Sequence, residues 1–106
     1  MVKEVLTGAG FVEGENFKET RFLKPPKTTY AVYKDSYTRR GADALNLVKE
    51  HYCTIELYSY TPDPEAEARL ENTFDNLGVE FDKEERYWIQ EEQLYQVIYN
   101  FSHIEK

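Results

Sequence analysis

The sequence predicts an α+β fold: a mostly antiparallel sheet of about four to five strands, with helices packed on one face. Three observations carry this prediction. Residues 47–60 alternate between two faces, residues 63–77 have the helical period, and residues 93–102 alternate again. At 106 residues with 41% hydrophobic side chains, the chain has the length and the apolar content for a single domain over residues 1–106 with one core.

The N-terminal region is expected to contribute one short helix. Apolar side chains at helical spacing place it over residues 2–8, and Gly8 and Gly10 end it. A short strand is expected near residues 17–23. Five apolar side chains of this region are expected to reach the core: Phe11, Val12, Phe17, Phe22 and Leu23. Pro25-Pro26 then enforces an extended entry into the next strand.

The middle of the chain reads as two strands with a long connection. Residues 28–34 are rich in β-branched and aromatic side chains, which predicts a strand. The stretch from Asp35 to Asn46 has no clean period, so residues 36–46 are expected to form a mobile loop. In the strand over 47–60, one face carries Cys53, Ile55 and Leu57 and is predicted to be the buried one.

The main helix has clear boundaries in the sequence. Asp63 suits the N-cap, Pro64 suits the first helical position, and Gly78 suits a left-handed C-cap. The stripe expected to be buried is Ala66, Leu70, Phe74 and Leu77. Val79 and Phe81 open a further strand. Residues 85–90 and 93–102 form two more strands around the turn Glu91-Glu92, with Val97, Tyr99 and Phe101 on one face of the last.

Charge is unevenly distributed along the chain, which has a net charge of −7. Residues 18–49 contain eight Lys and Arg against three acidic residues, whereas residues 50–106 contain four against fourteen. The acidic excess argues against nucleic-acid binding, so no sequence-specific nucleic-acid partner is expected. The basic part of one molecule can instead pair with the acidic part of a second copy.

Two further expectations concern the compartment. One cysteine, Cys53, and no recognisable export signal favour a reducing compartment. No stretch approaches the roughly 20 apolar residues that cross a bilayer, so no membrane partner is expected.

The candidate catalytic and ligand-binding motifs favour structural interpretations. Gly8-Ala9-Gly10 with Gly14 resembles a dinucleotide loop, but the third glycine comes one position late and no strand precedes it. His51 and Cys53 share a strand face, yet Cys53 is in line with Ile55 and Leu57 and is expected to be a small buried hydrophobe. His103 is expected in a terminal tail, and no metal-ligand spacing is recognisable.

Charged pairs such as Glu84-Glu85 are expected to form a solvated rim, because catalytic carboxyls need a pocket that perturbs one of them. No nucleophile, base and orienting group occur together. We therefore expect no enzyme activity, no catalytic residue, no metal and no cofactor. The segment 37–41 is basic with an aromatic neighbour and is either a contact loop or a solvated connection. The candidate interface residues are Tyr37, Arg39, Arg40, Glu91 and Glu92.

Four stretches resemble the small tail-terminator or tail-completion proteins of long-tailed bacteriophages and prophages. They are residues 26–33, residues 52–58, the helix start Asp63-Pro64-Glu65, and residues 92–99. Together they span roughly residues 25–101. The acidic residue followed shortly by Leu-Tyr-Gln-Val-Ile-Tyr is the most specific piece, and the loop with Arg39-Arg40 lies outside the resemblance.

The resemblance implies an α+β subunit of a ring, commonly a hexamer, that caps the tail tube and meets the head connector. The partners it implies are other copies of the chain, the tail-tube protein and the head-connector protein. The implied location is the virion, after synthesis in the bacterial cytoplasm. Another head–tail connector component, a stopper or adaptor, is the nearest alternative. A small dimeric regulatory or antitoxin-like adaptor that adds strands at a sheet edge is the alternative from a different class.

Overall fold

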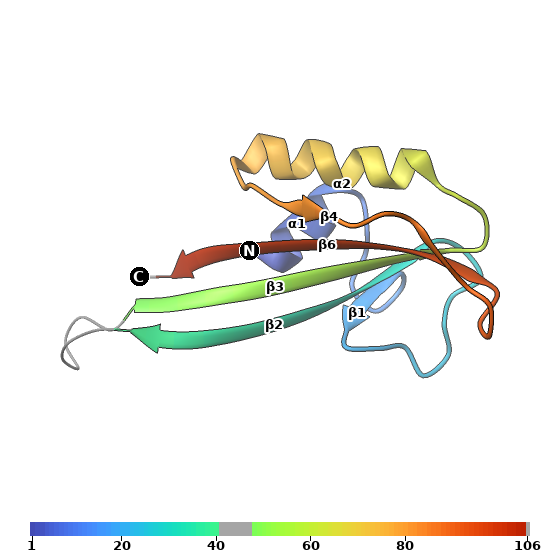
Figure 1. Cartoon of the computed structure of the whole chain (residues 1–106), viewed down its shortest axis with the longest axis horizontal. Helices are drawn as coiled ribbons and strands as arrows, with labels where there is room; N and C mark the ends of the chain where they lie inside the picture. The colour runs from blue at the N-terminus through green and yellow to red at the C-terminus, as the bar shows by residue number, and fades with distance from the viewer. Residues whose placement is uncertain (41–47, 106) are drawn as a thin grey trace.

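The computed structural model describes residues 1–40 and 48–105, and for Arg40 it describes the backbone but not the side chain. The chain has the predicted α+β fold (Figure 1). The elements in chain order are α1 (Val2–Gly8), β1 (Phe17–Glu19), β2 (Tyr30–Arg40), β3 (Val48–Ser59), α2 (Pro64–Leu77), β4 (Asp82–Lys83), β5 (Tyr87–Ile89) and β6 (Leu94–Glu105). The sheet has six strands rather than the expected four to five, because β1, β4 and β5 are short pieces at its margins.

Three long strands form the centre of the sheet. The strand order is β1-β2-β3-β6-β4, and β5 pairs with the first residues of β6. β3 is antiparallel to β2 from Tyr30↔Tyr58 to Arg40↔Val48, and to β6 along nearly its whole length. β1 pairs parallel with β2 and is the exception in an otherwise antiparallel sheet. The result is an elongated molecule of 49 × 28 × 24 Å.

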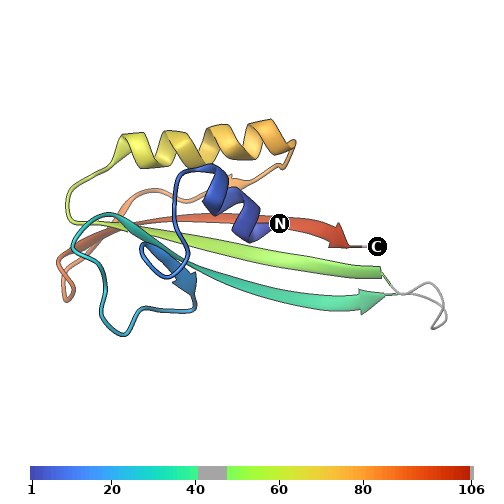
Figure 2. The same cartoon turned by 180° about the vertical axis from the view of Figure 1, so that it is seen from behind.

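Both helices pack on the same face of one half of the sheet. Leu70 and Phe74 of α2 are fully buried, as are Val5 and Leu6 of α1. Cys53, Ile55 and Leu57 of β3 and Val97, Tyr99 and Phe101 of β6 meet them, as their alternation predicts. The figures show this half as the thick part of the molecule, from which the three long strands continue past α2 (Figures 1 and 2).

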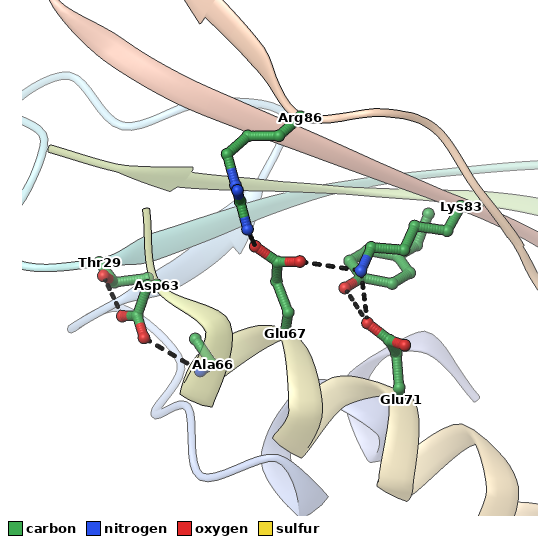
Figure 3. Close-up of polar contacts among 8 residues, drawn as sticks. Thr29, Asp63, Ala66, Glu67, Glu71, Lys83 and Arg86 are labelled. Carbon is green, nitrogen blue, oxygen red and sulfur yellow. Dashed lines mark hydrogen bonds and ion pairs between the residues drawn. The ribbon is translucent and has the colours of Figure 1, made fainter. Parts of the chain in front are cut away.

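The caps of α2 agree with the sequence. The Asp63 carboxylate accepts hydrogen bonds from the Ala66 amide at 3.1 Å and from the Thr29 hydroxyl at 2.6 Å (Figure 3). The Thr29 bond and the backbone bond lower the pKa of Asp63 against the opposing effect of burial. Gly78 ends the helix with a φ of 69°. Leu77, expected in the buried stripe, is 41% exposed because the last turn extends past its packing partners; Thr73 is buried instead.

The glycine loop after α1 ends a helix, as expected from the sequence. Gly10 has a φ of 94°, a conformation that favours glycine. The Arg69 side chain donates a hydrogen bond to the Ala9 carbonyl at 3.0 Å and so satisfies a terminal acceptor of the helix. A Cβ on Gly8 would lie 2.7 Å from Cγ2 of Thr73, so α1 packs against α2 with no room for a side chain at this position.

Three of the five apolar side chains expected in the core remain outside it. Phe11 and Phe17 are buried, and Phe22 is partly buried against Tyr30. Val12 is 51% exposed because it starts a tight turn in which its carbonyl accepts from Glu15 and Asn16. Leu23 is 78% exposed because the segment after Glu19 leaves the sheet at its edge.

The prediction of a loop over residues 36–46 is wrong for residues 36–40. Strand β2 continues to Arg40 and pairs with β3 throughout. The strand lacks an apolar period there because neither of the two described helices covers it, so neither face needs apolar side chains (Figure 1). The remainder of that expectation, residues 41–46, lies outside the described residues. His103 is likewise within β6 rather than in a tail.

Candidate interaction surface

The three long strands continue beyond the helices as a ribbon, made of residues 34–40, 48–52 and 102–105 (Figure 1). β1 covers the outer edge of β2 only at residues 31–33, and β4 covers the outer edge of β6 only at residues 99–100. In the part of the chain that the structure describes, both outer edges of the ribbon are therefore free of a neighbouring strand. Free backbone donors and acceptors on an edge can pair with a strand of another chain.

One side of the ribbon carries a cluster centred on His51. Its Nδ1 lies 2.8 Å from Oδ1 of Asp35, and its Nε2 lies 2.7 Å from Oε2 of Glu105. The hydrogen bond with Asp35, followed by that with Glu105, raises the pKa of His51. The ring of His103 stacks on that of His51 with centroids 4.5 Å apart. Burial and then the charge of His51 lower the pKa of His103, so the pair favours one proton on His51.

Tyr37 and Arg39 lie at the outer end of this same face. Tyr37 is 51% exposed, and Nζ of Lys49 lies 5.1 Å from its ring centroid. Arg39 is exposed and stands directly opposite Lys49 in the β2–β3 ladder. Glu105 of β6 stands opposite Lys49 on its other side, so this row across the described strands carries the two cations Arg39 and Lys49 and one carboxylate. Arg40 ends β2, and its side chain lies outside the described part.

Cys53 has the buried, inert environment expected from its strand face. It is 2% exposed, and burial followed by the charge of Asp35 raises the pKa of the thiol to about 12. The reactive thiolate is therefore scarce near neutral pH. Among the described residues, no group of three or more His, Cys, Asp or Glu side chains is placed to hold a metal ion.

The structure does not bring the candidate interface residues together. Glu91 and Glu92 lie exposed in the turn between β5 and β6, whereas Tyr37 and Arg39 lie near the other end of the sheet. The 12 residues of β6 separate the two ends, which corresponds to about 40 Å at the rise of a strand. Any common role of these residues would involve two separate contacts. Glu84 and Glu85 are exposed, in agreement with a solvated rim.

The two edges of the helix-covered half carry opposite charge. Next to β1, residues 18–27 form a basic edge with four exposed cations against Glu19: Lys18, Arg21, Lys24 and Lys27. The exposed carboxylates Glu13 and Glu15 precede β1 on the same edge, and Glu13 is paired with Lys3 at 3.0 Å. At the opposite end of the strand order, residues 75–85 form an acidic edge with five exposed carboxylates: Asp75, Glu80, Asp82, Glu84 and Glu85. The one cation within 75–85, Lys83, is already paired with Glu67 and Glu71, each at 2.8 Å.

A partly buried ion-pair network centred on the buried Glu67 fixes the acidic edge against α2 (Figure 3). Glu67 accepts from Arg86 at 2.6 Å and from Lys83 at 2.8 Å, and the Tyr99 hydroxyl donates to Glu71 at 2.9 Å. Burial alone would raise the pKa of Glu67, but the hydrogen bonds from Lys83 and Arg86 outweigh it and lower the pKa. The network therefore links α2, β4 and β6 into one unit that holds the acidic edge in place.

An open groove of about 700 Å³ lies on the acidic edge, where β4 stops pairing with β6. Its apolar lining comes from Val79, Phe81 and Phe101, and its carboxylates are Asp75, Glu80 and Asp82. We call this the edge groove. It could not be located from the sequence because it depends on where β4 ends. The alternation of Val79 and Phe81 with Glu80 and Asp82 was the available signal.

No protein-family model matches the chain, and no curated protein matches its sequence. None of the helices in the described part has the length and apolar character needed to traverse a membrane.

Proposed function

We propose that this protein is a head–tail joining protein of a long-tailed bacteriophage or prophage, which caps the finished tail tube as a ring of identical subunits. The resemblance of residues 25–101 to small tail-terminator proteins supports this assignment, as does the α+β fold that the resemblance implies. The proposed partners are further copies of the chain, the tail-tube end and the head connector. The proposed location is the head–tail joint of the virion.

The observation that carries the proposal is the opposite charge on the two edges of one small sheet. A symmetric dimer through either edge would place like charges together. A head-to-tail contact instead places the basic edge of one subunit on the acidic edge of the next. Contacts between unlike surfaces generate a ring when the rotation between subunits closes, and the resemblance implies a hexamer.

The ribbon supplies a second surface that remains available in such a ring. It projects from the helix-covered half and has two free strand edges in its described part. Tyr37 and Arg39 are exposed at its end, next to the second cation Lys49. We assign this end to contact with protein, namely the tail-tube end or the head connector. The acidic excess of the chain suits a passage through which DNA slides without being held.

The test of the ring is the mass and shape of the assembled protein. Native mass spectrometry and electron microscopy at high protein concentration should show closed rings. Sedimentation should show that the rings weaken as salt rises, because exposed charge contacts are screened. A monomer under every condition, even with tail-tube ends present, would refute the proposal. A stable dimer that binds a host enzyme would favour the regulatory adaptor instead.

The test of the tail-joining role is a matched pair of substitutions on β2. Arg39→Glu reverses the charge on the face that carries Tyr37, whereas Thr38→Glu places the same side chain on the opposite face of the same strand. We expect Arg39→Glu to fold normally and to impair tail joining in a complementation assay, and Thr38→Glu to complement. Binding of the rings to the head connector but not to tail tubes would favour a stopper or adaptor.

A further inference from the structure

Leu23 is the most exposed large apolar side chain in the described part of the chain, at 78%. The segment that carries Leu23 is held in place by contacts of its neighbouring residues. Phe22 beside it packs edge-on against Tyr30 with centroids 5.5 Å apart, and Tyr30 stacks on Tyr58 at 5.2 Å. Further along the same segment, the Tyr60 hydroxyl donates to the Pro26 carbonyl at 2.9 Å.

The chemistry around Leu23 is that of a small apolar contact with a basic border. Arg21 and Lys24 flank it and are exposed, and within the described residues neither forms an ion pair. An exposed leucine costs little by itself. An anchored leucine between two free cations, however, fits a partner that has an apolar hollow with acidic walls.

The edge groove has that complementary chemistry. Phe81 is partly buried and stacks on the fully buried Phe74 with centroids 4.6 Å apart, so its position is fixed by the core. Phe101 beside it is 6% exposed. The carboxylates Glu80 and Asp82 are exposed at its margin, and within the described residues neither forms an ion pair.

The segment with Leu23 and the edge groove lie on opposite sides of one molecule. The segment between β1 and β2 lies below the three long strands in both views, whereas α2 and β4, the strand at the β6 edge, lie above them (Figures 1 and 2). A subunit therefore cannot fill its own groove with its own Leu23. Two copies placed head to tail can do so, and the pair still has one free Leu23 segment, on one copy, and one free groove, on the other, for further neighbours.

We propose that Leu23 of one copy docks into the edge groove of the next copy, with Arg21 and Lys24 against Glu80 and Asp82. This inference rests on the proposed function for ring closure, and it specifies the contact from which the ring is built. The apolar part of the contact supplies affinity, because burying Leu23 removes its side chain from water. The charged residues around the contact favour the head-to-tail orientation of the two copies, because placing two Leu23 segments face to face would bring four cations together.

The direct test uses two single-cysteine additions, Leu23→Cys and Glu80→Cys, with a short bismaleimide reagent. The buried Cys53 thiol serves as the internal background, measured in the parent protein. In the proposed contact, position 23 of one copy faces position 80 of its neighbour. We therefore expect a cross-linked dimer in a 1:1 mixture of the two variants, at several times the yield obtained with either variant alone. No product in the mixture, or a predominant homodimer of the Leu23→Cys variant, would overturn the proposal.

A second measurement uses matched substitutions to aspartate. Leu23→Asp should weaken self-association at least about tenfold in sedimentation, the scale of losing one apolar anchor. Val12→Asp, also on an exposed aliphatic residue, should leave it unchanged. Arg21→Glu with Lys24→Glu, and Glu80→Lys with Asp82→Lys, should each abolish association alone. Mixing the two charge-reversed proteins should restore it, because each reversed surface then meets its complement.

These outcomes separate the contact from the proposed function. Rings that form without the mixed cross-link would overturn the Leu23 contact and leave the ring intact. A mixed cross-link in open chains that do not cap tails would support the contact and contradict the tail-terminator assignment. A monomer that gives no cross-link would overturn both.

Discussion

Replacing Gly8 by Ala places a methyl group where α1 and α2 meet. The new Cβ would lie 2.7 Å from Cγ2 of Thr73, a distance that real Cβ atoms essentially never show. Thr73 cannot easily move that methyl away, because its hydroxyl donates to the Arg69 carbonyl at 2.7 Å and because a β-branched side chain is stiff in a helix. Overpacking of this kind costs about 1–3 kcal/mol.

The opposing contribution is the helix preference of alanine over glycine, at most about 1 kcal/mol. We therefore expect Gly8→Ala to lower the free energy of unfolding by about 1–2 kcal/mol. For a domain of this size that lowers Tm by roughly 5–15 °C. Urea titration followed by circular dichroism measures the free energy, and calorimetry measures Tm.

The decisive comparison is a double-mutant cycle with Thr73→Ser, which removes Cγ2 and keeps the hydroxyl. If the methyl contact causes the loss, Gly8→Ala should cost little in the Thr73→Ser background, with a coupling energy of about 1 kcal/mol or more. Free energies that add within about 0.5 kcal/mol would refute the steric explanation. So would a Gly8→Ala protein that is more stable than the parent.

Three further predictions concern the core and the ribbon. Phe74→Ala should cost about 3–5 kcal/mol in urea titration, because it empties the centre of a cluster with Phe81 and Phe101; parental stability would contradict the packing. Cys53→Ala should cost about 1 kcal/mol, and rapid reaction of the native thiol with a maleimide would contradict its burial. The pKa of His51 is raised in the fold, so its stabilising contribution is complete below the unfolded pKa of about 6.5 and is lost as pH rises through the folded pKa. The urea midpoint of the parent should therefore fall relative to that of His51→Gln as pH increases above 6.5, and parallel pH profiles would contradict the bonds to the two carboxylates.

The elements that could be predicted from the sequence are those in which a local signal agrees with burial. Asp63 and Gly78 bound α2, and Cys53, Ile55 and Leu57 mark the covered face of β3. The ribbon was missed on β2 because its side chains have no buried face to impose an alternation. Leu23 is predicted in the core but is exposed, because the apolar character of a residue does not by itself show whether the fold will bury it.

The exposure of the candidate interface residues could be predicted, and their role in a contact stays a prediction. Tyr37 and Arg39 are exposed at the end of the ribbon, as a contact surface requires. Their separation from Glu91 and Glu92 by the length of β6 could not be foreseen, because strand length fixes it and β6 extends to Glu105 rather than to residue 102. The charge difference between the two halves of the chain can be read from the sequence. Its assignment to opposite edges depends on the strand order.

The uneven helix cover of the sheet has a consequence for how the molecule opens. Amides in the covered half exchange with solvent only when the core of Leu70 and Phe74 is disrupted, which requires global unfolding. Amides of the ribbon can exchange after its strands separate alone, because that opening exposes none of the helix-covered core. We therefore expect two classes of hydrogen exchange within the same three strands, with the boundary near Cys53. A partner strand paired to the ribbon would slow the faster class and leave the slower class unchanged.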